Sequence, residues 1–135
     1  MFAHITVGCS DIPRAVSFYD AVLNPLGIHR RDAEKPVEAS ATHICWTHAQ
    51  QDGPMFFVVV PFDDAAPSAG NGSMVAFAAA TPELVDLGYQ QGIASGGTDE
   101  GKPGLRPHYG DGYYGAYLRD PEGNKLHLVC RGDHG

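Results

Sequence analysis

The stretch HITVGCSDIPRAVSFYDAVLNPLG, residues 4–27, decides the fold because a second stretch of the same design follows it at a fixed distance. A shift of 70 residues places it on MVAFAAATPELVDLGYQQGIASGG, residues 74–97. Each copy starts with an alternating apolar segment, typical of a strand, and continues into a segment with the start and stop signals of a helix. These signals are the N-cap candidates Asp11 and Thr81, the prolines Pro13 and Pro82, and the closing glycines Gly27 and Gly97.

The same shift, with no gap, places residues 43–60 on residues 113–130. Both segments contain two apolar runs around an acidic-glycine turn, Asp52-Gly53 or Glu122-Gly123, which predicts a hairpin. Each half therefore reads as strand, helix and then several strands. The sequence predicts an α+β fold built from two βαβββ modules, residues 1–62 and 73–135, joined in one domain by a connecting loop, residues 63–72.

The two predicted helices differ in quality. The first carries an apolar stripe, Ile12, Val16, Tyr19 and Leu23, which predicts that it packs on a sheet. The second has interior glycines at Gly88 and Gly92, and each costs about 1 kcal/mol relative to alanine. The second helix should be the less stable of the two on its own.

Composition limits the classes of function. The chain has 135 residues and a formal net charge of −7, without a basic patch, so nucleic acid is not an expected partner. No apolar run is long enough to span a membrane, and no signal peptide is apparent. The three cysteines, Cys9, Cys45 and Cys130, lie in apolar contexts typical of reduced, buried thiols. We therefore expect a cytoplasmic protein.

The tandem unit, opening with HITVGCSDIPRAVSFYDAVLNPLG and closing with GYYGAYLRDPEGNKLHLV, resembles the vicinal oxygen chelate superfamily, which comprises glyoxalases, bleomycin-resistance proteins and dioxygenases. The resemblance covers essentially the whole chain. It implies curled mixed sheets around a cleft with helices on their outer faces. It also implies a small-molecule ligand, commonly a homodimer, and a divalent metal held by up to four side chains that point into the cleft.

By this resemblance, the metal positions fall on His4 and Met74 in the first strands and on Phe57 and His127 in the last strands. Strand alternation independently places His4 and His127 on the face away from the helices. His4 and His127 are therefore the candidate ligands for Zn, Ni, Mn, Co or Fe(II). The carboxylates that family members usually have at these positions are missing, and two protein ligands make a weak site.

The other candidate site residues belong to the cleft that the resemblance implies. His127, Tyr113 and His108 are candidates for proton transfer, since their side chains carry exchangeable protons. Arg106 could pair with a substrate carboxylate. The loop 104–117, which holds most of these residues among glycines and a proline, is typical of a pocket mouth. The residues expected to bind substrate are Phe57, Met74, Trp46, Arg106 and Tyr109.

Two functions remain open at this level. In the first, the chain binds a small oxygenated organic molecule and acts as a metal-assisted lyase or dioxygenase-like enzyme with a divergent metal site. In the second, the cleft is free of metal and sequesters a small molecule, as the bleomycin-resistance branch does. Phe57 and Met74 favour the second, because apolar walls with a few polar tips are typical of ligand pockets.

Overall fold

The computed structural model describes residues 1–48 and 52–132 of the chain. The first half contains β1 (His4–Gly8), α1 (Ile12–Leu23), the 3₁₀ turn η1 (Asn24–Leu26), β2 (Ile28–Arg30), β3 (His43–His48) and β4 (Met55–Val59). The second half contains β5 (Val75–Ala78), α2 (Pro82–Ala94), β6 (Thr98–Leu105), the 3₁₀ turn η2 (Pro107–Tyr109), β7 (Tyr114–Arg119) and β8 (Lys125–Cys130). The predicted order of elements is confirmed in both halves.

The two halves form two mixed sheets of the same topology. Sheet A has the strand order β1-β4-β3-β2 and sheet B the order β5-β8-β7-β6. In each sheet the first and last strands of the module pair in parallel, and the remaining pairs are antiparallel. The registers also correspond, since Thr6 lies opposite Phe57 and Ala76 lies opposite His127. The α+β duplication predicted from the offset of 70 residues is therefore confirmed.

Both helices start as predicted. The side chains of Asp11 and Thr81 accept hydrogen bonds from the backbone N–H groups of Arg14 and Leu84, which would otherwise lack partners in the first turn. The glycine that ends α2 is Gly96, one residue before the predicted Gly97. Gly96 adopts the left-handed conformation, with φ +100°, and the following N–H, of Gly97, donates to Gly92 O.

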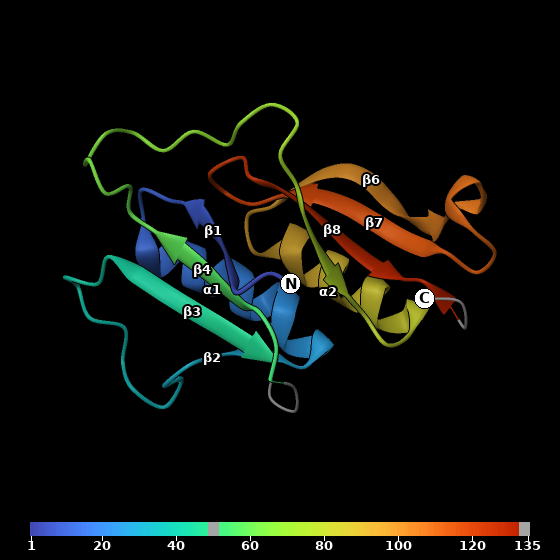
Figure 1. Cartoon of the computed structure of the whole chain (residues 1–135), viewed down its shortest axis with the longest axis horizontal. Helices are drawn as coiled ribbons and strands as arrows, with labels where there is room; N and C mark the ends of the chain where they lie inside the picture. Colours follow the sequence, from blue (N-terminus) through green and yellow to red (C-terminus); the bar gives the residue numbers. More distant parts are fainter. Residues whose placement is uncertain (49–51, 133–135) are drawn as a thin grey trace.

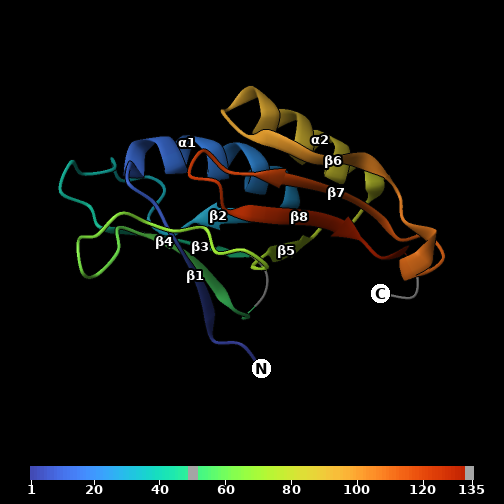
Figure 2. The same cartoon turned by 90° about the horizontal axis from the view of Figure 1, so that it is seen from above.

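The helices lie side by side on one side of the sheets and share a single core with them (Figures 1 and 2). The predicted stripe of α1 is buried, including Tyr19 at 1% exposure. Gly88 and Gly92 allow α2 to approach α1 closely. A Cβ built on Gly92 would lie 2.6 Å from Leu118 Cδ1 and 2.8 Å from Val22 Cγ2. The interior glycines thus serve packing between the modules.

A buried polar cluster also joins the modules. The hydroxyl of Tyr19 donates to Asp120 Oδ2 at 2.6 Å, and Asn124 Nδ2 donates to both Asp120 Oδ2 and Gly8 O. Asp120 Oδ1 accepts from the backbone N–H groups of Glu122 and Asn124. The DPEGN turn therefore orders itself and ties β8 to the end of β1. Because Asp120 and Asn124 are buried, the loss of one of these hydrogen bonds would destabilise the fold more than the loss of an exposed one.

The modules differ most before their hairpins. The strand that precedes the hairpin has three residues in the first half (β2) and eight in the second (β6), and β6 contains irregular register around Gly101. The predicted loop 104–117 is consequently too long, because β6 and β7 occupy its two ends.

The three cysteines are free and buried, as predicted. Among the described residues, no helix has the length and apolar character needed to cross a membrane.

Candidate functional site

The candidate residues lie mainly on the sheet faces that point away from the helices. In β1, Ile5 and Val7 pack against the core, whereas His4 and Thr6 are exposed on the opposite face. In β8, Leu126 and Leu128 belong to the core, and His127 points the other way. The predicted alternation is therefore confirmed for both strands. We call the sides away from the helices, which the resemblance expects to line the cleft, the outward faces of sheets A and B.

On the outward face of sheet A, the ring of His4 meets the ring of Phe57 edge to face, with centroids 5.4 Å apart. Beside them is a hollow of about 530 Å³. Its walls are mostly apolar and are formed by His4, Thr6, Thr42, His43, Met55, Phe57, Val59, Val60 and Phe62. The structure thus places the two predicted residues of this module together, at a surface that a small molecule could cover.

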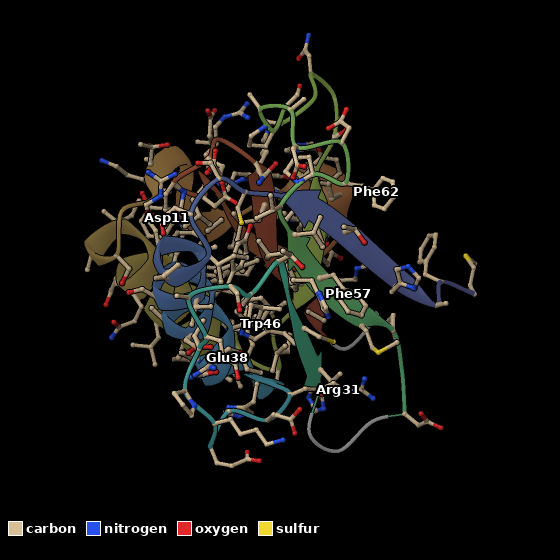
Figure 3. The ribbon with its side chains drawn as sticks, turned by 90° about the vertical axis from the view of Figure 1, so that its left-hand side faces the viewer. Asp11, Arg31, Glu38, Trp46, Phe57 and Phe62 are labelled. Carbon is tan, nitrogen blue, oxygen red and sulfur yellow. The ribbon has the colours of Figure 1, made fainter. Side chains whose placement is uncertain are left out.

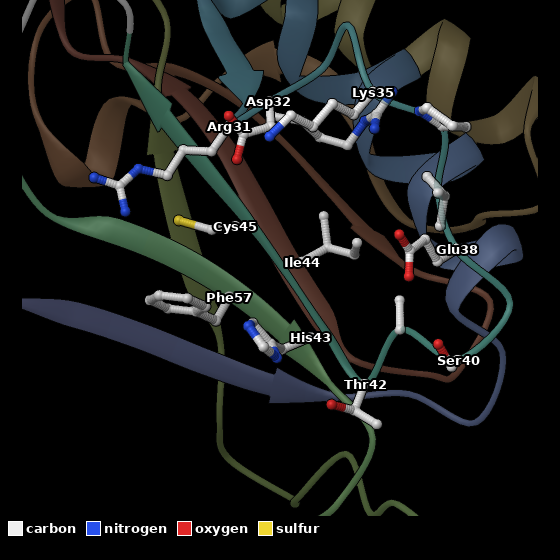
Figure 4. Close-up of a pocket in the computed structure, with 14 residues that line it drawn as sticks. Arg31, Asp32, Lys35, Glu38, Ser40, Thr42, His43, Ile44, Cys45 and Phe57 are labelled. Carbon is white, nitrogen blue, oxygen red and sulfur yellow. The ribbon is translucent and has the colours of Figure 1, made fainter.

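A second hollow, of about 510 Å³, adjoins the first at Thr42, His43 and Phe57. It lies between β3 and the segment 31–42, and Figure 4 shows Cys45, His43 and Phe57 along one side of it. Its charged lining residues have both signs, Arg30, Arg31 and Lys35 against Asp32 and Glu38. Because its charges have both signs, the second hollow does not favour a ligand of one particular charge.

On the outward face of sheet B, aromatic rings contact one another in sequence. Tyr109 lies 5.3 Å from Tyr113, Tyr113 lies 5.9 Å from His127, and His127 lies 4.0 Å from Tyr117, measured between ring centroids. The imidazole is nearly parallel to both of its tyrosine neighbours, at 16° and 10°. His108 extends the series, 4.1 Å from Tyr109. We call Tyr109, Tyr113, His127 and Tyr117 the aromatic stack.

Hydrogen bonds fix the tautomer of His127. Nδ1 lies 2.9 Å from Ala116 O, and a carbonyl oxygen can only accept, so Nδ1 carries the proton. Nε2 of the neutral ring is then an acceptor, and the hydroxyl of Tyr113 donates to it across 2.8 Å. Gly115 makes room for this ring, since a Cβ there would lie 2.5 Å from His127 Cε1.

The surroundings of His127 favour its neutral form. Burial lowers the pKa of His127 below its ordinary value, because the side chain is only 2% exposed and the charged form loses its hydration. The hydrogen bond to Ala116 O opposes this shift. The positive charges of Arg106, Arg131 and Lys125 lower the pKa further. His127 is therefore a neutral imidazole whose one lone pair is already engaged.

The predicted loop residues gather at the same end of sheet B. Tyr109 and Tyr113 line a hollow of about 350 Å³ together with Gly110, Asp111 and Arg131. Arg106 lies over the ring of Tyr117, with Cζ 5.8 Å from the centroid. Of the candidate residues, His127, Tyr113, Tyr109, His108 and Arg106 are therefore brought together, because β7 and β8 pair directly and η2 precedes β7.

Two candidate residues lie elsewhere. Trp46 is fully buried on the helix side of sheet A, where its indole N–H donates to Asp20 Oδ1. Figure 3 shows Trp46 toward the helices and Phe57 on the other side of the strands. Met74 is 45% exposed and directly precedes β5. Phe57, by contrast, contacts the predicted metal position His4.

The residues at the metal positions do not fit a closed metal centre. His4 and His127 lie on different sheets, the ring beside His4 belongs to Phe57, and Nε2 of His127 is taken by Tyr113. Over residues 1–48 and 52–132, no group of three or more His, Cys, Asp or Glu side chains could hold a metal ion. Structural and catalytic zinc sites use three or four such donors. No step is therefore assigned to a metal.

Two residues of this face were not among the predicted site residues: Tyr117, and Lys125, which strand alternation places on the same face as His127. Tyr117 lies directly opposite His127 in the β7–β8 register and stacks on it, and Lys125 Nζ lies 5.3 Å from the Tyr117 ring centroid. The alternation of β7 carries a usable signal, since Gly115 and Tyr117 share the face of His127. Without the register, however, it does not say which tyrosine meets the histidine.

Comparisons with known proteins agree with the fold. Residues 1–128 match the family model described as the Glyoxalase/Bleomycin resistance protein/Dioxygenase superfamily. No curated protein matches. A solved glyoxalase/bleomycin resistance protein from Albidiferax ferrireducens T118 is 37% identical, with a TM-score of 0.79, and the match covers 96% of this chain and 98% of that one.

More distant structures share the fold. A glyoxalase/bleomycin resistance protein/dioxygenase family enzyme from Burkholderia phytofirmans PsJN is 20% identical, with a TM-score of 0.70 over 96% of this chain and 97% of that one. TioX from Micromonospora sp. ML1 is 18% identical, with a TM-score of 0.63 over 97% of this chain and 98% of that one. By its family match and its 37% identical structural relative, this chain belongs to the glyoxalase/bleomycin resistance protein/dioxygenase superfamily.

Proposed function

We propose that this protein binds a small aromatic molecule bearing oxygen atoms, without a metal, against the outward face of sheet B. One observation carries the proposal: the Tyr113 hydroxyl occupies Nε2 of His127, so an aromatic stack stands where the family resemblance expects a metal ligand. The hollow beside Tyr109 and Tyr113 offers about 350 Å³ at the end of this stack.

The chemistry of the face suits an aromatic ligand. Tyr109 is 59% exposed and contacts Tyr113, so its ring offers a free apolar surface with a polar tip. Offset or edge contacts between aromatic rings contribute about 0.5–1.5 kcal/mol each beyond the area they bury. Hydroxyl groups at the ring edges supply hydrogen bonds to ligand oxygens. Two or three such contacts correspond to micromolar or weaker affinity for a small probe.

The test is a fluorescence titration with N-phenyl-1-naphthylamine, an uncharged aromatic dye that brightens in apolar surroundings. The Tyr109→Leu/Tyr113→Leu variant should weaken its binding by about tenfold, since two ring contacts are removed. The matched control is Phe62→Leu, which removes a fully exposed ring beside the hollow of sheet A. Equal weakening in both variants, or none in the tyrosine variant, would overturn the proposal.

The Tyr113–His127 hydrogen bond supports a second candidate function, metal-free proton transfer. In this function the Tyr113 oxygen takes a proton from a carbon of the bound ligand as its own hydroxyl proton passes to Nε2 of His127, and the reverse transfer returns a proton to the ligand and restores both side chains. His108, two residues along the ring series, would assist. The measurement is deuterium uptake into hydroxyacetone in D₂O by proton NMR. Uptake above the buffer rate that Tyr113→Phe abolishes would support catalysis, and uptake at the buffer rate would exclude this reaction.

We also propose that two copies of the chain associate. Several large apolar side chains on or near the outward faces are exposed, and they would be covered by a second copy. They are Phe2, Phe62 and Met74. Light scattering coupled to gel filtration should give twice the chain mass of 14.4 kDa. A single-chain mass at high micromolar concentration would contradict the dimer.

A further inference from the structure

Two positive charges flank one ring of the aromatic stack. Arg106 Cζ lies 5.8 Å from the centroid of Tyr117, and Lys125 Nζ lies 5.3 Å from it. The two side chains come from different segments, Arg106 from the residue that follows β6 and Lys125 from the start of β8. Their charges therefore converge on Tyr117, which itself stacks on His127.

Neither cation forms an ion pair with a carboxylate in the part of the chain that the structure describes. The ion pairs among residues 1–48 and 52–132 use Arg14, Arg30 and Arg119. Arg119 differs from the two cations: it lies on β7, two residues after Tyr117, and forms an ion pair with Glu100 at 2.6 Å. What sets Arg106 and Lys125 apart from the other cations without a described ion pair is that both lie over the same ring, Tyr117. They leave a locally positive face open to an anion.

The backbone holds Arg106 in this position. Its guanidinium donates to Lys102 O at 2.7 Å and to Leu105 O at 3.3 Å, which leaves three of its five N–H groups for other acceptors. Two glycines of β6 make room for it. A Cβ on Gly104 would lie 3.1 Å from Arg106 Nη1, and a Cβ on Gly101 would lie 3.0 Å from the Tyr117 ring and 3.5 Å from Arg106 Nη2.

From this arrangement we propose that the ligand is an aromatic carboxylate, whose anion is held by Arg106 and Lys125 while its ring lies against the tyrosines. The planar guanidinium matches the two oxygens of a carboxylate, and the ammonium of Lys125 adds a second, flexible charge. The inference rests on the proposed function, since it names the class of ligand for the same face. It goes further in assigning Lys125 and the two β6 glycines to anion binding.

The experiment compares 2-naphthoate with 2-naphthamide by isothermal titration at low salt. These probes have the same ring and nearly the same shape, and only the first is charged. We expect wild type to bind the naphthoate about tenfold more tightly, because hydrogen bonds to charged groups are the stronger class. In the Arg106→Gln/Lys125→Gln variant this ratio should fall to about one, with naphthamide binding kept within about twofold.

The control variant is Arg31→Gln/Lys35→Gln, which removes two charges of the same sign beside the hollow of sheet A. It should keep the naphthoate preference. A ratio near one in wild type, or equal losses in both double variants, would overturn the inference. A Gly104→Ala variant gives a second readout, since displacing Arg106 should weaken naphthoate binding and spare naphthamide binding.

The two proposals fail differently in these measurements. If the uncharged dye binds at the tyrosines but naphthoate shows no preference over naphthamide, the anion site is wrong and the proposed function stands. If the dye and both naphthalene probes fail to bind, the proposed function is wrong and the anion site is lost with it.

Discussion

The hydroxyl of Tyr113 lies 2.8 Å from Nε2 of His127, and Nδ1 of the same imidazole is fixed by Ala116 O. Both ring nitrogens of a nearly inaccessible histidine are thereby satisfied by the protein itself. This arrangement settles the tautomer of His127 and leaves its neighbouring tyrosine rings as the part of the face that a ligand can reach.

Tyr113→Phe should lower the free energy of unfolding by about 1–2 kcal/mol, because it leaves the buried Nε2 of His127 without a donor. Urea unfolding at pH 7.5 measures the change. Tyr114→Phe is the matched control, since its hydroxyl donates to Asp86, whose carboxylate water can solvate instead. A loss in Tyr113→Phe no greater than that in Tyr114→Phe would show that the bond to His127 is not a buried constraint.

Stability should depend on pH through His127. Folding lowers the pKa of this imidazole below its ordinary 6.5, mainly by burial, so the unfolded chain takes up the proton first as the pH falls. The free energy of unfolding should therefore decline as the pH drops through about 6.5 toward the lower pKa of the folded state. His127→Gln should lack this part of the decline, and the exposed His29→Gln should retain it. Parallel pH profiles for wild type and His127→Gln would contradict the assignment.

Tyr19→Phe should destabilise the chain by about 1–3 kcal/mol, because it removes one donor from the buried carboxylate of Asp120. Burial and the neighbouring charge of Asp120 raise the pKa of Tyr19 well above its ordinary value, so the phenol stays a donor at all working pH values. Tyr89→Phe, which loses a bond to exposed Asp99, should cost less. Chemical denaturation of the two variants distinguishes them, and equal costs would show that the junction between the modules is not the stronger contact.

Gly92→Ala should destabilise the protein by about 1–3 kcal/mol even though alanine is the better helix former. The added methyl would lie within 3 Å of methyl groups of Leu118 and Val22, so these side chains or α2 itself must shift. Gln91→Ala, an exposed substitution in the same helix, should be neutral or slightly stabilising. Thermal unfolding of both variants is the measurement, and a stabilised Gly92→Ala would mean that the helices are not in close contact.

The sequence predicts the duplication well, because the helix caps and the turn between β7 and β8 depend on local chemistry. Asp11 and Thr81 cap their helices, and the register of Phe57 and His127 within their sheets follows the offset. Strand alternation also places His4 and His127 on the correct faces. These features depend on periodicity and spacing, which are visible in a single chain.

Features that depend on contacts between strands could not be predicted as well from the sequence. The stacking of Tyr117 on His127 and the convergence of Arg106 and Lys125 on Tyr117 require the β6–β7–β8 registers, and β6 is irregular. Trp46 is aromatic and lies on β3 of sheet A, but its side chain enters the core on the helix side, where the indole N–H bonds to the half-buried Asp20. The unequal lengths of β2 and β6 have no signal in the weakly patterned segments that precede the two hairpins.

The most direct test of the central claim is a titration of N-phenyl-1-naphthylamine into protein treated with a chelator and into the same protein supplied with Zn²⁺ or Ni²⁺. If the aromatic stack binds ligands without a metal, the two dissociation constants should agree within about twofold, and Tyr109→Leu/Tyr113→Leu should weaken both equally. Dye binding that appears only with metal, and that His4→Ala/His127→Ala abolishes, would contradict the account.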